Sequence, residues 1–116
     1  MRGYTSYNVY SRAADNRACS GVSILVKNSI PQVKVPITSN LQCIAVRVSL
    51  HKSFTICNIY VPPSQSFSTD DLEHVISQLP GTFMLVGDFN AHHIILGNNY
   101  TTSKVNEIDK FVSQIP

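Results

Sequence analysis

The architecture of this chain is clearest from the stretch Phe83-Met84-Leu85-Val86-Gly87-Asp88-Phe89-Asn90. Its apolar first half, residues 83–86, predicts a buried strand that stops at the glycine. An acid and an amide follow at once, and two histidines come directly after them. In α/β proteins, ligands collect at the carboxyl ends of strands. The stretch therefore predicts a sheet and a functional site at one edge of it.

A helix is predicted immediately before this strand. Ser68 is suited to cap it, and Asp71 stands where a capping box places its acid. His74 falls off the apolar stripe and should face solvent, and Pro80-Gly81 should end the helix. The stripe itself recurs at helical spacing and consists of Leu72, Val75, Ile76 and Leu79.

The first half of the chain predicts strands with no helix between them. Pro36 marks one as an edge strand, because proline cannot donate to a central ladder, and residues 51–53 form a turn between two antiparallel strands. The strands are expected at residues 21–27, 33–37, 43–50 and 54–61. After a polar loop at 98–103, a second helix is expected from Val105, Ile108, Phe111, Val112 and Ile115. This order favours an α/β fold with a mostly antiparallel sheet and helices on one face.

Composition places few further constraints on function. The 116 residues suffice for one domain, and no apolar run is long enough for a membrane span. Residues 1–69 carry seven Lys/Arg and one acid, a net charge of +6, and residues 70–116 carry two Lys/Arg and six acids, a net charge of −4. A basic half can attract DNA, but dispersed, solvated charges explain the pattern better. Those charges are Arg2, Arg12, Arg17, Lys27, Lys34, Arg47 and Lys52.

The three cysteines form no C-x-x-C pair. Cys43 and Cys57 lie in apolar runs, where a free thiol behaves as a small buried hydrophobic group. Neither a disulfide framework nor a zinc site is indicated. With no signal-peptide pattern at the N-terminus, the expected location is intracellular.

The candidate site residues allow two interpretations each. Asp88 and Asn90 have period-two spacing and face the same side if extended, which suits Mg²⁺ or phosphate, but a side-chain-capped turn explains the same residue types. Tyr60 ends its strand, where its hydroxyl meets a phosphate or only packs half-buried. His92 and His93 are adjacent and face opposite ways on a strand, so one of them can reach the site.

Residues 87–93, Gly-Asp-Phe-Asn-Ala-His-His, resemble the signature of the endonuclease domains of non-LTR retrotransposons. These domains belong to the endonuclease/exonuclease/phosphatase superfamily and are similar in fold to DNase I. Three further segments resemble the family in the expected order, at residues 20–27, 58–63 and 72–80. Several ordered segments are much more specific than one short motif.

The resemblance implies a four-layer α/β sandwich and Mg²⁺-dependent cleavage of phosphodiester bonds in DNA, in the nucleus for the intact activity. By position, Asp88 and Asn90 would orient the attacking water and hold the scissile phosphate, and Tyr60 would contact that phosphate. His93, and more weakly His92, would face the substrate, and Asp88 would be the metal ligand. The chain would be fused to, or derived from, a reverse transcriptase polyprotein.

Parts of the family pattern have no match here. The family has an Asn on its first strand and a metal-binding Glu shortly after it, whereas residues 1–20 contain no Glu and neither Asn8 nor Asn16 sits in such a strand pattern. A closing Ser-Asp-His is also absent, and only Glu107 and Asp109 are acidic after Asn90. We therefore expect residues 1–116 to be one partial domain with little or no nuclease activity alone. The alternatives are a noncatalytic remnant that binds nucleic acid or protein weakly, and an enzyme for small phosphate esters.

Overall fold

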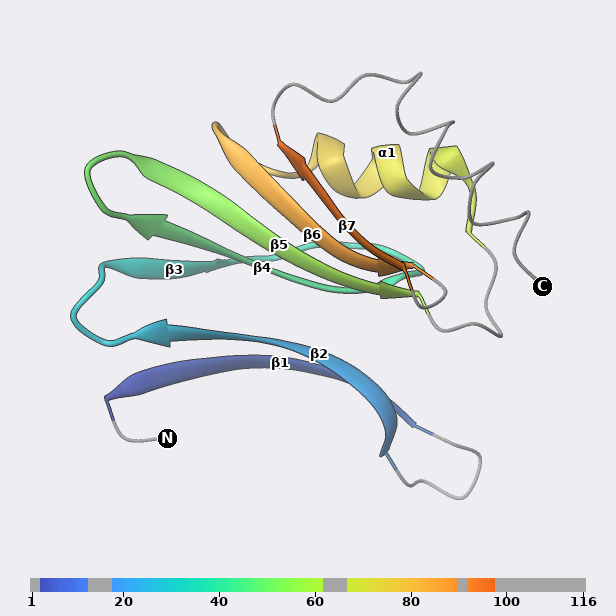
Figure 1. Ribbon diagram of the computed structural model, residues 1–116, viewed down its shortest axis with the longest axis horizontal. Coiled ribbons are helices and arrows are strands. Elements are labelled where there is room, and N and C mark those ends of the chain that lie inside the picture. The colour runs from blue at the N-terminus through green and yellow to red at the C-terminus, as the bar shows by residue number, and fades with distance from the viewer. Residues whose placement is uncertain (1–2, 13–17, 62–66, 90–91, 98–116) are drawn as a thin grey trace.

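The computed structural model describes residues 3–12, 18–61, 67–89 and 92–97. Within these ranges the chain forms five strands, then a helix, then two more strands (Figure 1). They are β1 (Tyr4–Arg12), β2 (Ala18–Lys27), β3 (Gln32–Val35), β4 (Gln42–Ser49), β5 (Ser53–Val61), α1 (Thr69–Ser77), β6 (Phe83–Phe89) and β7 (His92–Gly97).

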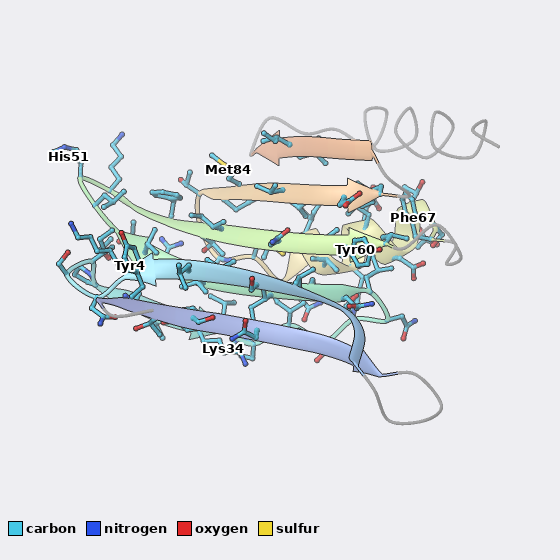
Figure 2. The ribbon with its side chains drawn as sticks, turned by 60° about the horizontal axis from the view of Figure 1, so that its bottom comes forward. Tyr4, Lys34, His51, Tyr60, Phe67 and Met84 are labelled. Atoms are coloured by element: carbon cyan, nitrogen blue, oxygen red, sulfur yellow. The ribbon has the colours of Figure 1, made fainter. Side chains whose placement is uncertain are left out.

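The described elements form three layers. Strands β1 and β2 make a two-stranded sheet, and β3-β4-β5-β6-β7 make a five-stranded sheet in that order. Helix α1 lies against one face of the larger sheet, while β1 and β2 lie on its other side (Figures 1 and 2). All paired strands are antiparallel except β5 and β6, which are parallel because α1 connects them. The predicted class is confirmed: a mostly antiparallel α/β fold of the DNase I-like sandwich type.

Two hydrophobic cores hold these layers together. The larger one lies between α1 and the five-stranded sheet, and the whole predicted stripe of the helix is buried in it. The smaller one lies between the two sheets, around Val26, Val46 and Val48. Strand β4 contributes to both cores because its side chains alternate between the two faces. Strand β3 is an edge strand, as predicted, but it ends at Val35, before Pro36, and not at Ile37 as expected.

Helix α1 begins as the sequence predicts. The side chain of Ser68 accepts a hydrogen bond from the backbone N–H of Asp71, and the Asp71 carboxylate accepts one from the backbone N–H of Ser68, which completes a capping box. His74 is exposed. The following turn contains Gly81 with φ +62°, a conformation that side chains disfavour. Local interactions and the turn conformation thus define both ends of the helix.

Replacing Ser68 by alanine removes the oxygen that caps α1. We expect Ser68→Ala to lower the free energy of unfolding by about 1 kcal/mol, the usual cost of losing an N-cap. Denaturant unfolding monitored by far-ultraviolet circular dichroism measures this loss. Ser77→Ala is the matched control, because the Ser77 hydroxyl donates only to the His74 carbonyl of its own helix. An equal loss in both variants would contradict the capping role.

Three strand predictions were wrong. Strand β6 continues through Gly87 to Phe89, so Asp88 belongs to a strand and not to a turn after it. Strand β7 was missed because its six residues are too short for a clear pattern. Strand β1 was also missed, since its polar residues mask the alternation. The loop at 98–103, the second helix and Asn16 lie outside the described residues.

Asn8 does sit in a strand, contrary to expectation. It belongs to β1, where its neighbours Tyr7 and Val9 are half-buried and Asn8 itself is exposed. Its side-chain amide donates to the Ser6 hydroxyl at 2.9 Å. The alternation of the strand places Asn8 on the face away from the five-stranded sheet. Asn8 therefore does not supply the first-strand Asn of the family pattern.

Arg47 is not a solvated charge, although Lys27, Lys34 and Lys52 are exposed as predicted. It is half-buried, and its guanidinium donates to the Thr55 hydroxyl at 2.9 Å and to the Pro80 carbonyl at 2.8 Å. The Thr55 hydroxyl donates to the same carbonyl at 2.9 Å. These bonds tie the turn after α1 to β4 and β5.

Cys43 and Cys57 are buried free thiols, as predicted. They lie on neighbouring strands in the core beneath α1. The hydrogen bond with Cys43, together with burial, raises the pKa of the Cys57 thiol. Both residues therefore act as part of the core.

None of the helices in the described ranges is long and apolar enough to cross a bilayer.

Candidate active site

The side chains of β6 alternate between the core beneath α1 and a cavity on the other face of the sheet. Leu85, Gly87 and Phe89 are buried on the side of α1. A Cβ on Gly87 would overlap the Phe89 ring, so this ring folds back over the glycine. The ring also contacts Phe67, with centroids 5.2 Å apart. Asp88 lies between these anchored positions and points to the other face.

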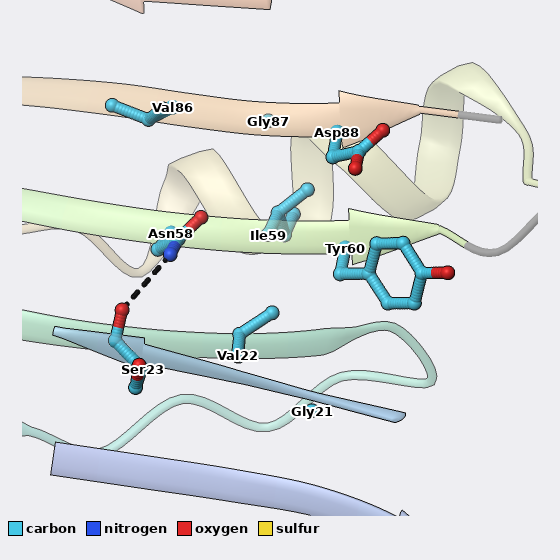
Figure 3. Close-up of a pocket in the computed structure, with 9 residues that line it drawn as sticks. All are labelled: Gly21, Val22, Ser23, Asn58, Ile59, Tyr60, Val86, Gly87 and Asp88. Atoms are coloured by element: carbon cyan, nitrogen blue, oxygen red, sulfur yellow. Dashed lines mark hydrogen bonds between the residues drawn. The ribbon is translucent and has the colours of Figure 1, made fainter. Parts of the chain in front are cut away.

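Asp88 lines a cavity of about 420 Å³ on the face away from α1. Figure 3 shows the cavity between β2 and the adjacent strands β5 and β6. Val86 contributes an apolar side chain to it, and Ile59 of β5 also borders it, although the Ile59 side chain is buried in the core beneath α1. Its remaining walls consist of Gly21, Val22 and Ser23 from β2, and of Asn58, Tyr60, Gly87 and Asp88 from β5 and β6.

One oxygen of Asp88 is left without a partner in this cavity. Its Oδ1 is buried and accepts no hydrogen bond from the described residues. Nearly all buried polar atoms in proteins are hydrogen-bonded, and an unpaired one costs about 1–3 kcal/mol. A carboxylate oxygen kept in this state is suited to accept a water, a cation or a substrate donor.

Tyr60 stands directly beside Asp88. The two residues are register partners on the parallel strands β5 and β6, and both side chains line the cavity. In Figure 3 the Tyr60 hydroxyl extends past the end of its strand. Tyr60 is half-buried, and it is one of the residues that line the cavity. The structure thus brings together two of the three predicted catalytic residues.

The other predicted residues are only partly placed. The backbone of His93 is opposite Asp88 in the β6–β7 ladder, and that of His92 is opposite Phe89. Tyr60, Asp88 and His93 therefore form one row across three strands. The side chains of His92 and His93, and the whole of Asn90, lie outside the described residues.

Sequence reasoning missed Asn58 as a residue of this site. Asn58 lines the cavity and donates from its side-chain nitrogen to the Ser23 carbonyl at 3.0 Å. A signal for it was present, because a polar side chain two positions before Tyr60 must share its face. The β2 wall, by contrast, follows only from how the two sheets pack.

The donor set permits a divalent cation with few protein ligands. No group of three or more His, Cys, Asp or Glu side chains gathers anywhere in the described part of the chain. Mg²⁺ commonly binds one or two carboxylates and takes its remaining ligands from water and substrate phosphates. The Asp88 oxygen that has no partner among the described residues fits this mode of binding, and Asp88 would then be the protein ligand.

The known proteins to which this chain is similar come from mobile genetic elements. The family described as "Endonuclease-reverse transcriptase" matches residues 54–115. The RNA-directed DNA polymerases from mobile element jockey of Drosophila melanogaster and Drosophila funebris are 30% and 26% identical over 84% and 97% of this chain. A probable RNA-directed DNA polymerase from transposon X-element of Drosophila melanogaster is 29% identical over 82% of it.

The chain spans only 11–12% of the length of these relatives. No solved structure matches it at a significant level. The family match covers more than half of the chain, including β5, α1, β6 and β7 with Tyr60 and Asp88. This chain belongs to the endonuclease-reverse transcriptase family and derives from a retrotransposon polyprotein.

Proposed function

We propose that this chain contributes the phosphate-binding face of a Mg²⁺-dependent DNA endonuclease domain. The observation that carries the proposal is the buried oxygen of Asp88, which has no partner among the described residues and lies beside Tyr60 in a cavity of about 420 Å³. Membership of the endonuclease-reverse transcriptase family supports DNA as the substrate. The same membership favours DNA over small phosphate esters.

Each residue has a role in this proposal. Asp88 would hold the cation and orient the attacking water through its carboxylate. Tyr60 donates its hydroxyl hydrogen to an oxygen of the scissile phosphate. Asn90 and His93 are proposed as further phosphate and DNA contacts from their position in the motif. When bound, the Mg²⁺ ion supplies positive charge that stabilises the phosphate in the transition state.

The activity of this polypeptide alone is proposed to be weak. Among the described residues that line the cavity, Asp88 is the sole carboxylate. A cation held by one protein carboxylate relies on water and substrate for its other ligands. When catalytic groups act as a unit, removing one of them abolishes most of the rate of the catalysed reaction. The remnant alternative, binding without cleavage, is an outcome of the following test.

We expect the chain to nick supercoiled plasmid slowly with Mg²⁺, and Asp88→Ala to reduce nicking to the level of buffer alone. The matched control is Asp70→Ala, which removes an exposed acid of α1. Binding of Mn²⁺, measured by electron paramagnetic resonance, should be lost in Asp88→Ala only. The melting temperature of Asp88→Ala should not fall, because losing Oδ1 leaves none of the described residues without a hydrogen-bond partner.

Equal nicking by the chain and Asp88→Ala would remove Asp88 from the active site. No nicking by either protein, with DNA binding retained, would establish the noncatalytic remnant. Cleavage of small phosphate esters without plasmid nicking would show that the site belongs to an enzyme for small phosphate esters.

A further inference from the structure

Asn58 links the two sheets at the cavity. It lies on β5 two residues before Tyr60, and its register partner on β6 is Val86. Its Nδ2 donates to the backbone carbonyl of Ser23 on β2 at 3.0 Å, as the dashed line in Figure 3 shows. Ser23 belongs to the opposite wall of the same cavity. One side chain therefore spans the distance between the two walls.

Most contacts between the sheets do not fix this distance. The inter-sheet core is apolar and centres on Val26, Val46 and Val48. Apolar contact is non-directional, so it holds the layers together without setting a position along them. The Tyr7 hydroxyl donates to the Gln32 side chain at 2.7 Å, but that bond joins β1 to β3. The Asn58–Ser23 hydrogen bond is directional and acts at the cavity itself.

The bond also fixes which way the carboxamide of Asn58 faces. A backbone carbonyl only accepts hydrogen bonds, so the amide nitrogen must face Ser23. The Oδ1 atom then faces away from β2, toward the side of β6 in Figure 3. That side carries Asp88. The hydrogen bond to Ser23 thus determines the orientation of the Asn58 carboxamide, and the Oδ1 acceptor is directed toward the β6 side of the cavity.

We propose that Asn58 is a positioning residue that holds the Gly21–Ser23 wall of β2 at a fixed distance from Tyr60 and Asp88, and so sets the width of the cleft for a phosphodiester backbone. This proposal rests on the proposed function. A wall held by one directional bond admits a DNA strand of defined width. Without the bond, the hydrogen bonds of Gln32 with Tyr7 and with Lys27 still join the two sheets, but they lie at the other end of β2 from this wall.

The test compares two substitutions that each remove one side-chain amide. Asn58→Leu keeps a similar volume and removes the donor to Ser23. Gln78→Leu removes the amide of Gln78, which donates to the Thr38 carbonyl at 2.8 Å beside α1. Gln78 does not line the cavity. The control therefore matches the lost chemistry at a place remote from the cleft.

Two measurements are made on the 116-residue chain and both variants. Amide hydrogen exchange reports local opening at Gly21, Val22 and Ser23, and fluorescence anisotropy reports binding of a fluorescein-labelled 12-base-pair DNA duplex with Ca²⁺. We expect Asn58→Leu to speed exchange at these three amides and to raise the Kd for the duplex about tenfold, the scale of one lost hydrogen bond. Gln78→Leu should change neither quantity.

Unchanged exchange at the β2 wall in Asn58→Leu would overturn the proposal, because this readout needs no DNA. Faster exchange with an unaltered Kd would overturn it equally, since the wall would then not set the cleft. If the unmodified chain fails to bind the duplex, the proposed function fails. In that case faster exchange would still support Asn58 as the residue that positions the wall.

Discussion

Gly87→Ala should destabilise this protein by about 3 kcal/mol, the upper part of the usual range for overpacking a core. The added Cβ would lie 2.5 Å from Cζ and 2.8 Å from Cδ2 of Phe89. The ring cannot move aside easily, because Phe89 is fully buried and packs against Phe67. The free energy of unfolding, measured by urea denaturation, gives the size of the effect.

Gly97→Ala is the control for this prediction. Gly97 is also a strand glycine, but its added Cβ would meet only the Phe83 carbonyl at 3.7 Å, an ordinary contact. We expect a change of less than about 0.5 kcal/mol there. In a protein that already carries Phe89→Leu, Gly87→Ala should cost less stability than it does beside Phe89, since the smaller side chain leaves room for the methyl group. Equal effects at both glycines would refute the steric explanation.

Leu72→Ala should cost about 3 kcal/mol, within the range for a buried leucine. Leu72 is fully buried between α1 and the five-stranded sheet. Alanine is the best helix former, so the loss comes from packing and not from the helix backbone. Thermal and urea unfolding give the change in the free energy of unfolding.

The matched control is Leu50→Ala, because 58% of the Leu50 side chain is exposed in the turn before β5. The change there should stay within about 0.5 kcal/mol. A large loss at Leu50 together with a small one at Leu72 would show that the core is not the one described.

Much of the fold could be predicted because its signals are local. The apolar stripe of α1, its capping box and the alternation of β4 and β5 each depend on neighbouring residues. Strand β7 depends on its pairing with β6, and β1 on its pairing with β2. Such pairing is a tertiary effect that short or polar sequences do not reveal.

The candidate site was predicted in part for the same reason. Asp88 and Tyr60 were indicated by their places in a motif and at a strand end. Their proximity requires the parallel register of β5 and β6, which no pattern within either strand specifies. Ser23 takes part through its backbone carbonyl, and a backbone atom carries no residue-type signal. Arg47 was misjudged because its partners come from the distant segments of Thr55 and Pro80.

The alternation along β6 has a consequence for how copies of such mobile elements decay. A copy that loses Asp88 keeps Gly87 and Phe89, and with them the packing of β6 against α1. A copy in which a larger residue replaces Gly87 is destabilised by the clash with Phe89, whichever residue stands at position 88. Inert but durable proteins should therefore accumulate through the first route. In a survey of element copies, the glycine and the phenylalanine would report survival of the fold, and the aspartate would report the activity proposed for this site.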